Sequence, residues 1–406
     1  MRPPLIDLSL GMELYATETR PVNSATLPHS ERSFVVYELY EDYRAAPPYE
    51  PIGSCSPRAR WLAYAVRKHR ISTIQAARTL SSVFRCQLYS FSGLKEAWGV
   101  THQLIFFSEC ANPHPYVCLK RLEAVFLGCV PRPLRSSGNE FRIELRVSGS
   151  DTERLLDNVR TVRSVAIPNY YGYQRFGYVR PISHAVGKAL VLKNWDDALI
   201  HILGRPYPYE NPLAIQARRL CEAGNFCEAT RLFRGAGLEL EYTVSRRLCR
   251  GSDTLNALQA LGKDVLMLYV NAFQSYLFNR ILSRLWVLGS VKGRVPVPGH
   301  GLRVSNDLIS KIVREVLDME SVNPSDFRLE KLGVKARYWY REPFMVVKPE
   351  IKCVHQVSKE SACTLSFILR RGSYATVVLR ELLKTDIPRL WIASMERASS
   401  CHVETA

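Results

Sequence analysis

The feature of this sequence that most constrains its fold is a segment of strict alternation from Phe141 to Val147. Apolar and charged side chains follow each other there with a period of two, which is typical of a β-strand that buries only one face. We therefore predict a half-buried strand whose charged side chains face away from the core. Further strands are predicted at residues 34–38, 88–91 and 100–107, where β-branched and aromatic residues gather.

Helical patterns lie between these strands. Residues 58–85 carry apolar side chains at helical spacing, and the basic run from Arg67 to Arg70 is predicted to end one helix before another begins at Ser72. Ser150 and Glu153 have the spacing of a capping box, which predicts that a helix follows. The first 30 residues have no sustained period, so we predict an arm with a loose tip.

The pattern changes in the second half of the chain. Residues 195–288 and 313–319 are helical in pattern, strand-like segments return at 346–348 and 365–369, and an apolar segment follows at 374–382. The end of the chain is therefore predicted to rejoin the first domain. Together with a length of 406 residues, this pattern predicts an α+β protein of two domains.

The charge of the chain points to a polyanionic partner. Lysine and arginine number 55 against 38 acidic residues, so the formal net charge is +17. Such an excess indicates either nucleic acid or an acidic membrane surface. No apolar run approaches the length that spans a bilayer and no basic amphipathic helix is evident, so we expect nucleic acid and no membrane. The alternative is a basic surface that binds nothing in particular.

The spacing of the cysteines and the absence of known short motifs limit which metals and cofactors the protein is expected to bind. Eleven cysteines are spread through the chain without a C-x-x-C pair or a Cys/His cluster at zinc spacing. This pattern predicts neither structural zinc nor a disulfide framework, and it favours the reducing cytoplasm. The glycine motifs of nucleotide-binding proteins and the H-E-x-x-H motif are absent from the sequence. We therefore expect no metal and no cofactor.

An aromatic string, N-Y-Y-G-Y-Q-R-F-G at residues 169–177, cannot form a regular amphipathic element. One interpretation is a loop that exposes flat π faces beside Arg175, as an unstacked nucleobase and its phosphate require. The other interpretation is a buried aromatic turn in which Arg175 pairs with a carboxylate.

The same string resembles the N-Y-F-G-x-Q-R-F-G signature of the TruD pseudouridine synthases, with Tyr171 in place of the usual Phe. Further segments similar to the archaeal branch of that family are R-P-I-S-H-A-V-G-K at 180–188, Q-S-Y-L-F-N at 274–279 and G-S-Y-A-T-V-V-L-R-E at 372–381. The resemblance implies a pseudouridine-synthase domain with a mixed β-sheet, formed by residues 1–193 and 346–406. It also implies an inserted, largely helical domain at residues 194–345.

The family's catalytic string G-L-K-D, followed by Thr and Gln, corresponds to residues 93–103. Glu96 stands where the family has its essential Asp, directly after Lys95. By resemblance Glu96 is the catalytic carboxylate, acting either as a nucleophile at C1′ or as the base that removes the 2′ proton. Its extra methylene shifts the carboxylate by roughly 1 Å, which can cost ~100-fold in rate. Outside this motif, a Lys–Glu pair would indicate a solvated surface ion pair.

The resemblance also implies substrate-binding residues, namely Phe34, Lys68, Lys95, Asn169, Tyr171, Arg175 and Tyr374. Phe34 and Asn169 match positions that contact the target nucleotide, and Tyr374 matches the aromatic that packs on its base. Phe34 is otherwise a core residue and Tyr374 a strand aromatic. Residues 274–279 lie in a helical pattern and are expected to serve packing. The basic and aromatic segment 335–341 suits either phosphate contacts or a solvated charged face.

The function that the resemblance implies is isomerisation of uridine to pseudouridine in RNA, with tRNA as the expected partner and Glu96 as the active-site carboxylate. The alternative is a catalytically impaired RNA-binding paralogue that keeps the fold. A third possibility is a basic protein that binds nucleic acid without specificity.

Overall fold

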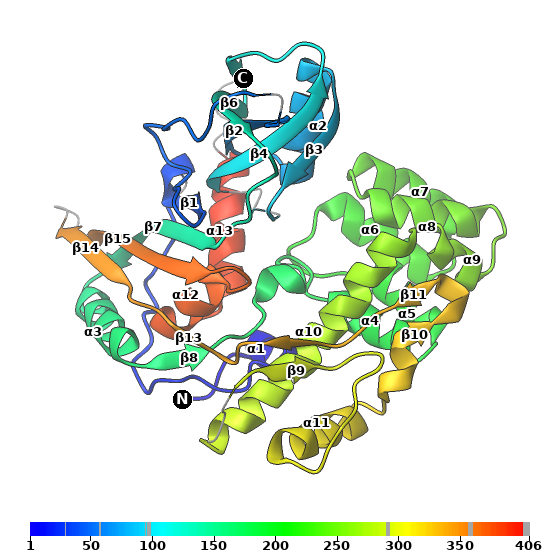
Figure 1. Cartoon of the computed structure of the whole chain (residues 1–406). Helices are drawn as coiled ribbons and strands as arrows, with labels where there is room; N and C mark the ends of the chain where they lie inside the picture. Colours follow the sequence, from blue (N-terminus) through cyan, green and yellow to red (C-terminus); the bar gives the residue numbers. More distant parts are fainter. Residues whose placement is uncertain are drawn as a thin grey trace.

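The computed structural model describes residues 1–28, 30–56, 58–93, 95, 99–289, 293–355 and 360–400, with the side chains of His355 and residues 394–400 outside that description. Within these ranges its centre is a nine-stranded mixed sheet in the order β14-β15-β7-β1-β4-β2-β6-β5, with β3 also paired to β4 (Figure 1). The strands are β1 (Phe34–Leu39), β2 (Trp61–Lys68), β3 (Cys86–Phe91), β4 (Val100–Cys110), β5 (Tyr116–Leu119), β6 (Leu122–Val130), β7 (Gly138–Ser148), β14 (Glu350–His355) and β15 (Glu360–Arg370).

The register of this sheet confirms the predicted strands at 34–38, 88–91, 100–107 and 141–147. β1 runs parallel to β4 and antiparallel to β7, and β7 pairs on its other side with β15. Along β7, Ile143 is buried whereas Arg142 is exposed, as the alternation predicts. The α+β fold class is confirmed. The domain division at residues 193 and 346 stays a prediction.

Helices cover one face of the sheet. α3 (Asp151–Ser164), α12 (Ala375–Leu383) and α13 (Ile387–Ser400) contribute apolar side chains to the core beneath β7 and β15, and α2 (Thr73–Phe84) packs on β3 and β4. Figure 1 shows α13, in red, rising from α12 toward the strands β1 and β4. In the part of the chain that the structure describes, no helix combines the length and the apolar character needed to cross a membrane.

The predicted helical region is confirmed and forms a body of its own beside the sheet (Figure 1). Its helices are α4 (Ser183–Val191), α5 (Trp195–Leu203), α6 (Pro212–Glu222), α7 (Phe226–Gly235), α8 (Glu239–Cys249), α9 (Thr254–Gln259), α10 (Lys263–Val287) and α11 (Leu308–Met319). Short antiparallel pairs accompany it, namely β8 (Ala166–Pro168) with β13 (Phe344–Val346), β9 (Val295–Val297) with β12 (Trp339–Arg341) and β10 (Arg328–Leu329) with β11 (Val334–Lys335).

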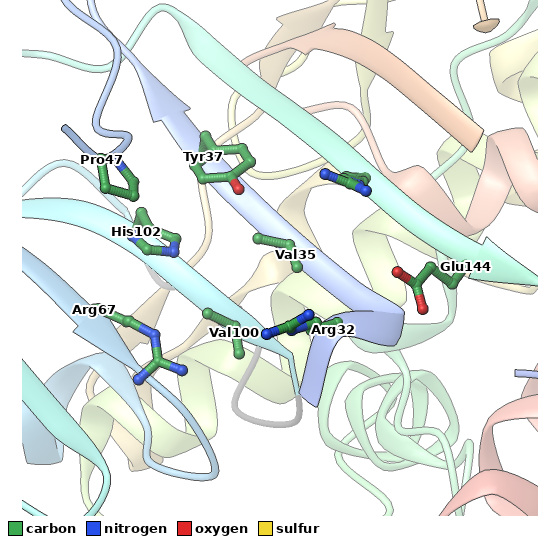
Figure 2. Close-up of a pocket in the computed structure, with 9 residues that line it drawn as sticks. Arg32, Val35, Tyr37, Pro47, Arg67, Val100, His102 and Glu144 are labelled. Atoms are coloured by element: carbon green, nitrogen blue, oxygen red, sulfur yellow. The ribbon is translucent and has the colours of Figure 1, made fainter. Parts of the chain in front are cut away.

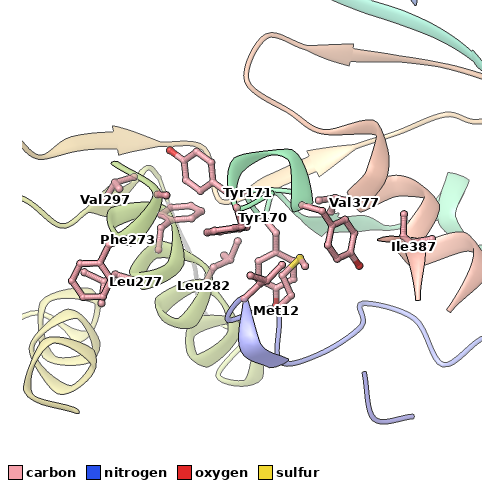
Figure 3. Close-up of a cluster of buried hydrophobic side chains, with 14 of the residues drawn as sticks. Met12, Tyr170, Tyr171, Phe273, Leu277, Leu282, Val297, Val377 and Ile387 are labelled. Atoms are coloured by element: carbon pink, nitrogen blue, oxygen red, sulfur yellow. The ribbon is translucent and has the colours of Figure 1, made fainter. Parts of the chain in front are cut away.

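One hydrophobic cluster joins these parts. Phe273 and Leu282 of α10 lie in the same cluster as Tyr170, Met12 of the N-terminal arm and Val377 of α12 (Figure 3). The cluster therefore connects the helical body with the arm and with the helices that cover the sheet.

Two local predictions were wrong because the elements are buried on both faces. Residues 58–67 are predicted as helix, but Trp61–Lys68 is a strand between β4 and β6. Its two faces pack into different hydrophobic clusters, so no alternation marks it. Residues 374–382 are grouped with the strands, but α12 is a helix whose residues are all buried. The helices after Ser72 and Ser150 are confirmed, although Ser150 makes no side-chain cap.

The N-terminal arm is bound to the core at Asp7, whereas Met1 and Arg2 at its tip are exposed, and the loose tip stays a prediction. α1 (Leu5–Ser9) buries Asp7, whose carboxylate accepts hydrogen bonds from Arg380 Nε and from the Tyr173 hydroxyl, each at 2.5 Å. Burial raises the pKa of Asp7, while the charge of Arg380 opposes that shift. Because Arg380 lies on α12, the arm is tied to a helix that covers the sheet.

The prediction that no disulfide framework exists was also wrong. The described residues contain four disulfides, Cys55–Cys129, Cys86–Cys110, Cys227–Cys249 and Cys353–Cys363, and two free cysteines, Cys118 and Cys221. Two of the bonds link directly opposed residues of neighbouring strands, β3 with β4 and β14 with β15. Such pairs become visible only once the strand register is known, which cysteine spacing does not reveal.

We expect the Cys55→Ser/Cys129→Ser double variant to lower the free energy of unfolding by about 4 kcal/mol, since the chain-entropy model scales with the length of the closed loop. This bond closes the longest of the four loops, with a sequence separation of 74 residues. Denaturant unfolding without reductant measures the effect. Cys118→Ser, at an exposed free thiol, is the control and should change nothing. Equal stability of all three proteins would contradict the assignment.

Candidate active site

The chain just before Glu96 is held by buried polar groups from three elements. The backbone N–H of Lys95 donates to Oγ1 of Thr73, the first residue of α2, at 3.0 Å. Thr73 donates in turn to Oε1 of Gln103 on β4 at 3.1 Å. The Lys95 carbonyl accepts a hydrogen bond from Nζ of Lys68 on β2 at 3.4 Å. Because Thr73, Gln103 and Lys68 are all buried, the backbone at Lys95 is fixed against the sheet.

The side chain of Lys95 forms an ion pair with Glu38 of β1. Glu38 is fully buried and also accepts a hydrogen bond from the hydroxyl of Tyr40. Burial and the adjacent charge of Glu38 raise the pKa of Tyr40, so this hydroxyl stays a donor. The Lys95 ammonium is therefore engaged by a carboxylate inside the protein. Sequence reasoning missed Glu38 because an acidic residue near a strand end carries no signal of its own.

Glu96 itself lies outside the described residues, so its geometry is not part of this structure. Near Lys95, Nε2 of the buried Gln103 has no hydrogen-bond partner among the described residues. A buried donor left unpaired costs about 1–3 kcal/mol. Gln103 is therefore a candidate donor to a group that binds near this loop.

The aromatic string at 169–177 is buried, so the interpretation as an exposed π surface was wrong. Tyr170, Tyr173 and Phe176 are fully buried, and Tyr171 is 6% exposed. The string continues from β8 through a 3-10 turn, Tyr173–Arg175, against α10. Asn279 of α10 accepts from the Tyr171 N–H at 2.8 Å and donates to the Tyr171 carbonyl at 3.1 Å. This contact gives segment 274–279 a packing role.

Arg341 of β12 holds the string to the loop before α12. Its guanidinium donates to the Asn169 carbonyl and to Asn169 Oδ1, the latter at 2.9 Å, and to the Gly372 carbonyl at 2.8 Å. Its Cζ lies 4.1 Å from the ring centroid of Tyr171 and 6.0 Å from that of Tyr374. Burial lowers the pKa of Arg341. The structure thus brings Asn169, Tyr171 and Tyr374 together around an arginine that turns inward, whereas the sequence suggested a phosphate contact or a solvated face.

Tyr374 is half-buried and precedes the first turn of α12. Its ring lies 6.0 Å from that of Tyr171 in an edge-to-face arrangement. Burial raises its pKa. Gly172 permits this approach, because a Cβ there would come within 2.9 Å of Tyr374 Cβ and 2.7 Å of Thr376 Oγ1. Tyr374 is therefore a loop aromatic at a helix start and not a strand residue.

Arg175 has a neutral partner in place of the carboxylate that the buried-turn interpretation predicted. Its Nε donates to Oγ of Ser275 on α10 at 3.0 Å. Its Cζ lies 5.9 Å from the ring centroid of Tyr171, which places it at the edge of the same aromatic group. Arg175 is half-buried.

Phe34 begins β1 and is 7% exposed. Its ring packs against Phe141 and, at 5.1 Å and edge-on, against Trp391 of α13. A Cβ at Gly99 would come within 2.7 Å of Phe34 Cδ1. Trp391 also stacks on Tyr178, just after the aromatic string. Phe34 therefore lies beside Gly99 but is covered by α13, as the core alternative for Phe34 predicts.

Within the described residues, no three His, Cys, Asp or Glu side chains gather as a metal site would require. The candidate site is a polar network around Lys95 and an aromatic group around Arg341. Between them, Phe34 lies against Gly99 and Trp391, and Trp391 stacks on Tyr178, just after the aromatic string.

A model of one protein family, described as tRNA pseudouridine synthase D (TruD), matches residues 9–295 and 287–382. The chain belongs to the TruD family. The "Probable tRNA pseudouridine synthase D" of Pyrobaculum islandicum is 31% identical over 95% of this chain and 98% of its own length. The Methanopyrus kandleri protein of the same description is 34% identical over 79% of this chain and 85% of its own length.

A crystal structure of the TruD protein from Methanosarcina mazei is similar in fold. The two structures align over 96% of this chain and 100% of the Methanosarcina mazei chain, with a TM-score of 0.72 and 24% sequence identity. The mixed sheet with its helical body is therefore a TruD fold. The family match ends at residue 382, so α13 and its Trp391 lie beyond it.

Proposed function

We propose that this TruD protein is a tRNA pseudouridine synthase whose catalytic carboxylate is Glu96. The observation that supports this most is the buried cradle of Thr73, Lys68 and Gln103, which fixes the backbone of Lys95 directly before the carboxylate position. Catalysis by a positioned carboxylate depends on such fixation, because displacements of about 1 Å can cost 100-fold in rate. The family to which the chain belongs supports the reaction and the RNA class.

The reaction requires no external atoms or electrons. The bond from N1 of uracil to C1′ of the ribose breaks, the base turns, and a bond from C5 to C1′ forms. The proton on C5 leaves and N1 takes up a proton, so the product is an isomer of the substrate. Glu96 acts at the ribose, as nucleophile at C1′ or as base at the 2′ carbon.

The aromatic group supplies the surface for the extruded base. A flipped uracil loses its stacking neighbours, and one aromatic contact restores about 1–3 kcal/mol. Tyr374, half-buried, is the candidate for that contact, with Tyr171 behind it. Asn169 is oriented by Arg341, and Arg175 lies at the edge of the group. Phe34 contacts the nucleotide only if α13 moves away, since Trp391 covers it here.

Lys68 and Lys95 act in this proposal mainly by positioning. Lys68 donates to the Lys95 carbonyl, and the Lys95 ammonium pairs with Glu38. The Glu38 carboxylate neutralises the Lys95 ammonium, so the role of Lys95 is to hold this part of the chain against β1, while Lys68 holds its backbone. A cytoplasmic location follows from the tRNA substrate. The disulfides suit that location only in an organism like the hyperthermophilic archaea, whose intracellular proteins are rich in them.

Digestion of tRNA after incubation with the protein, followed by chromatographic separation of the nucleosides, tests this function. We expect pseudouridine to appear at one or a few positions and uridine to fall by the same amount. Binding of tRNA without any pseudouridine would reject the enzyme and leave the RNA-binding alternative.

Binding to tRNA should depend strongly on salt. A chain with a net charge of +17 that docks on phosphates displaces counterions, so affinity should fall at least about tenfold between 50 mM and 200 mM salt. Filter binding over a series of salt concentrations measures the slope. Duplex DNA is the comparison, because non-specific binding would give both nucleic acids equal affinity. A flat salt dependence would contradict a phosphate interface.

A further inference from the structure

We propose that the face of the sheet opposite the candidate active site binds the phosphate backbone of the tRNA substrate. The inference rests on the proposed function for the identity of the RNA. None of the candidate active-site residues lies on this surface.

The alternation of each strand defines this opposite face. On β1, Glu38 faces Lys95 while its neighbour Tyr37 lies on the other side of the sheet. On β2, Lys68 faces the Lys95 loop while Arg67 lies on the other side. β4 and β7 follow the same rule, with Gln103 and Ile143 on the active-site face and with His102 and Arg142 on the opposite one.

The opposite face is hollowed into a cavity of about 400 Å³ across β1, β4 and β7. Figure 2 shows Tyr37 and Pro47 at one end, Val35 in the centre, and Arg32 beside Val100 at the other end. Its charged lining consists of Arg32, Arg67, Arg142 and Glu144. A second cavity of about 360 Å³ shares Tyr37 and Arg142 with the first and adds Arg44, Lys352, Glu140 and Glu350. The two cavities adjoin each other at Tyr37 and Arg142, and we call the surface that they form together the track.

The positive charges on this track differ in how far they are already neutralised. Arg67 lies 3.1 Å from Glu123 and 3.3 Å from Glu31, and Arg44 lies 2.7 Å from Glu140. Arg32 and Arg142 are exposed and have no carboxylate within ion-pair distance among the described residues. These two guanidinium groups are therefore free to bind an anion, and Arg forms bidentate contacts with phosphate.

The aromatic side chains on the track are not free to stack on a base. One neighbour of the Tyr37 ring is His102, stacked at 4.9 Å, and another is the guanidinium of Arg44, at 4.5 Å from the ring centroid. Burial and the charges of Arg67 and Arg44 lower the pKa of His102 to about 4, so His102 adds no charge at neutral pH. The surface thus offers arginines for phosphates and no open aromatic face, which favours contact with the backbone over contact with bases.

The Arg32→Gln/Arg142→Gln double variant tests this surface, because exposed side chains without partners can be replaced at little cost in stability. We expect affinity for tRNA at 0.15 M salt to fall about tenfold and the salt slope to decrease by about 1.5, for two lost phosphate contacts. Arg231→Gln/Arg247→Gln removes the same charge from exposed arginines of α7 and α8 that likewise have no carboxylate within ion-pair distance among the described residues, so it is the matched control. Equal slopes for the variant and the control would overturn the inference.

A footprint on the unaltered protein gives an independent measurement. Lys352 is exposed on β14 and lines the second cavity, so bound tRNA should protect it from acetylation, whereas Lys331, exposed on the helical body, is the comparison. Protection of both lysines or of neither would count against the surface. Turnover of tRNA is measured in parallel. No turnover with a reduced slope would reject the proposed function alone, and turnover with an unchanged slope would reject this inference alone.

Discussion

Glu96→Ala is expected to abolish turnover, and Glu96→Asp to raise it above that of the natural protein. Removal of a positioned carboxylate costs roughly 100-fold to 10,000-fold in rate. The aspartate restores the shorter side chain that the family has at this position. The buried cradle fixes the backbone at Lys95, and on a fixed backbone the extra methylene of a glutamate shifts its carboxylate by roughly 1 Å relative to an aspartate, which can cost ~100-fold. Single-turnover rates on tRNA measure both effects.

Affinity for tRNA should barely change in either variant, since the effect lies in the transition state. If Glu96→Asp is slower than the natural protein while Glu96→Ala is inactive, the backbone has adapted to the longer side chain. Equal rates for the natural protein and Glu96→Ala would contradict the assignment of the carboxylate.

Arg341→Met is expected to lower kcat/KM by roughly tenfold to 100-fold and the free energy of unfolding by about 2–5 kcal/mol, because several acceptors, some of them partly buried, lose their donor together. The lost contacts are those to the Asn169 carbonyl, to Asn169 Oδ1 and to the Gly372 carbonyl. Without them the Asn169 amide and the loop that carries Tyr374 lose their common support. Arg341→Lys keeps the charge, but an ammonium group cannot donate to all of these acceptors at once. This variant should therefore retain only part of the rate.

Arg337→Met is the matched control, because Arg337 is an exposed arginine on the same segment. It should leave stability unchanged. Rates are compared well below the unfolding midpoint of each variant, so that loss of positioning is separated from loss of folded protein. If Arg341→Met and Arg337→Met behave alike, Arg341 does not organise the aromatic group.

The parts of the fold with one buried face could be predicted from the sequence. Segment 141–147 alternates because β7 has helices beneath it and solvent or an open cavity above, and the structure places it as predicted. β2 could not be recognised, because one face packs on α2 and the other on a separate cluster, which removes the alternation. The disulfides depend on strand register, a property that no local pattern encodes.

The site residues that belong to a sequence motif could be predicted. Those whose role depends on a tertiary contact could not. Asn169, Tyr171 and Tyr374 come from separate motifs, and the structure gathers them. Arg341 contacts all three of these residues. The sequence does not distinguish it from an exposed basic residue, because only its hydrogen bonds to Asn169 and Gly372 in the folded protein show that it points inward. Glu38 was missed for the same reason, since its partner lies 57 residues away in sequence.

Pseudouridine formation by this protein can be followed by the release of tritium from tRNA that carries uridine labelled at C5. Moving the glycosidic bond from N1 to C5 must expel the hydrogen on C5, whichever mechanism Glu96 follows. We predict that the natural protein releases tritium into water in proportion to the pseudouridine formed, and that Glu96→Ala binds the same tRNA and releases none. Tight tRNA binding by the natural protein without tritium release, on every tRNA of its source organism, would contradict the account.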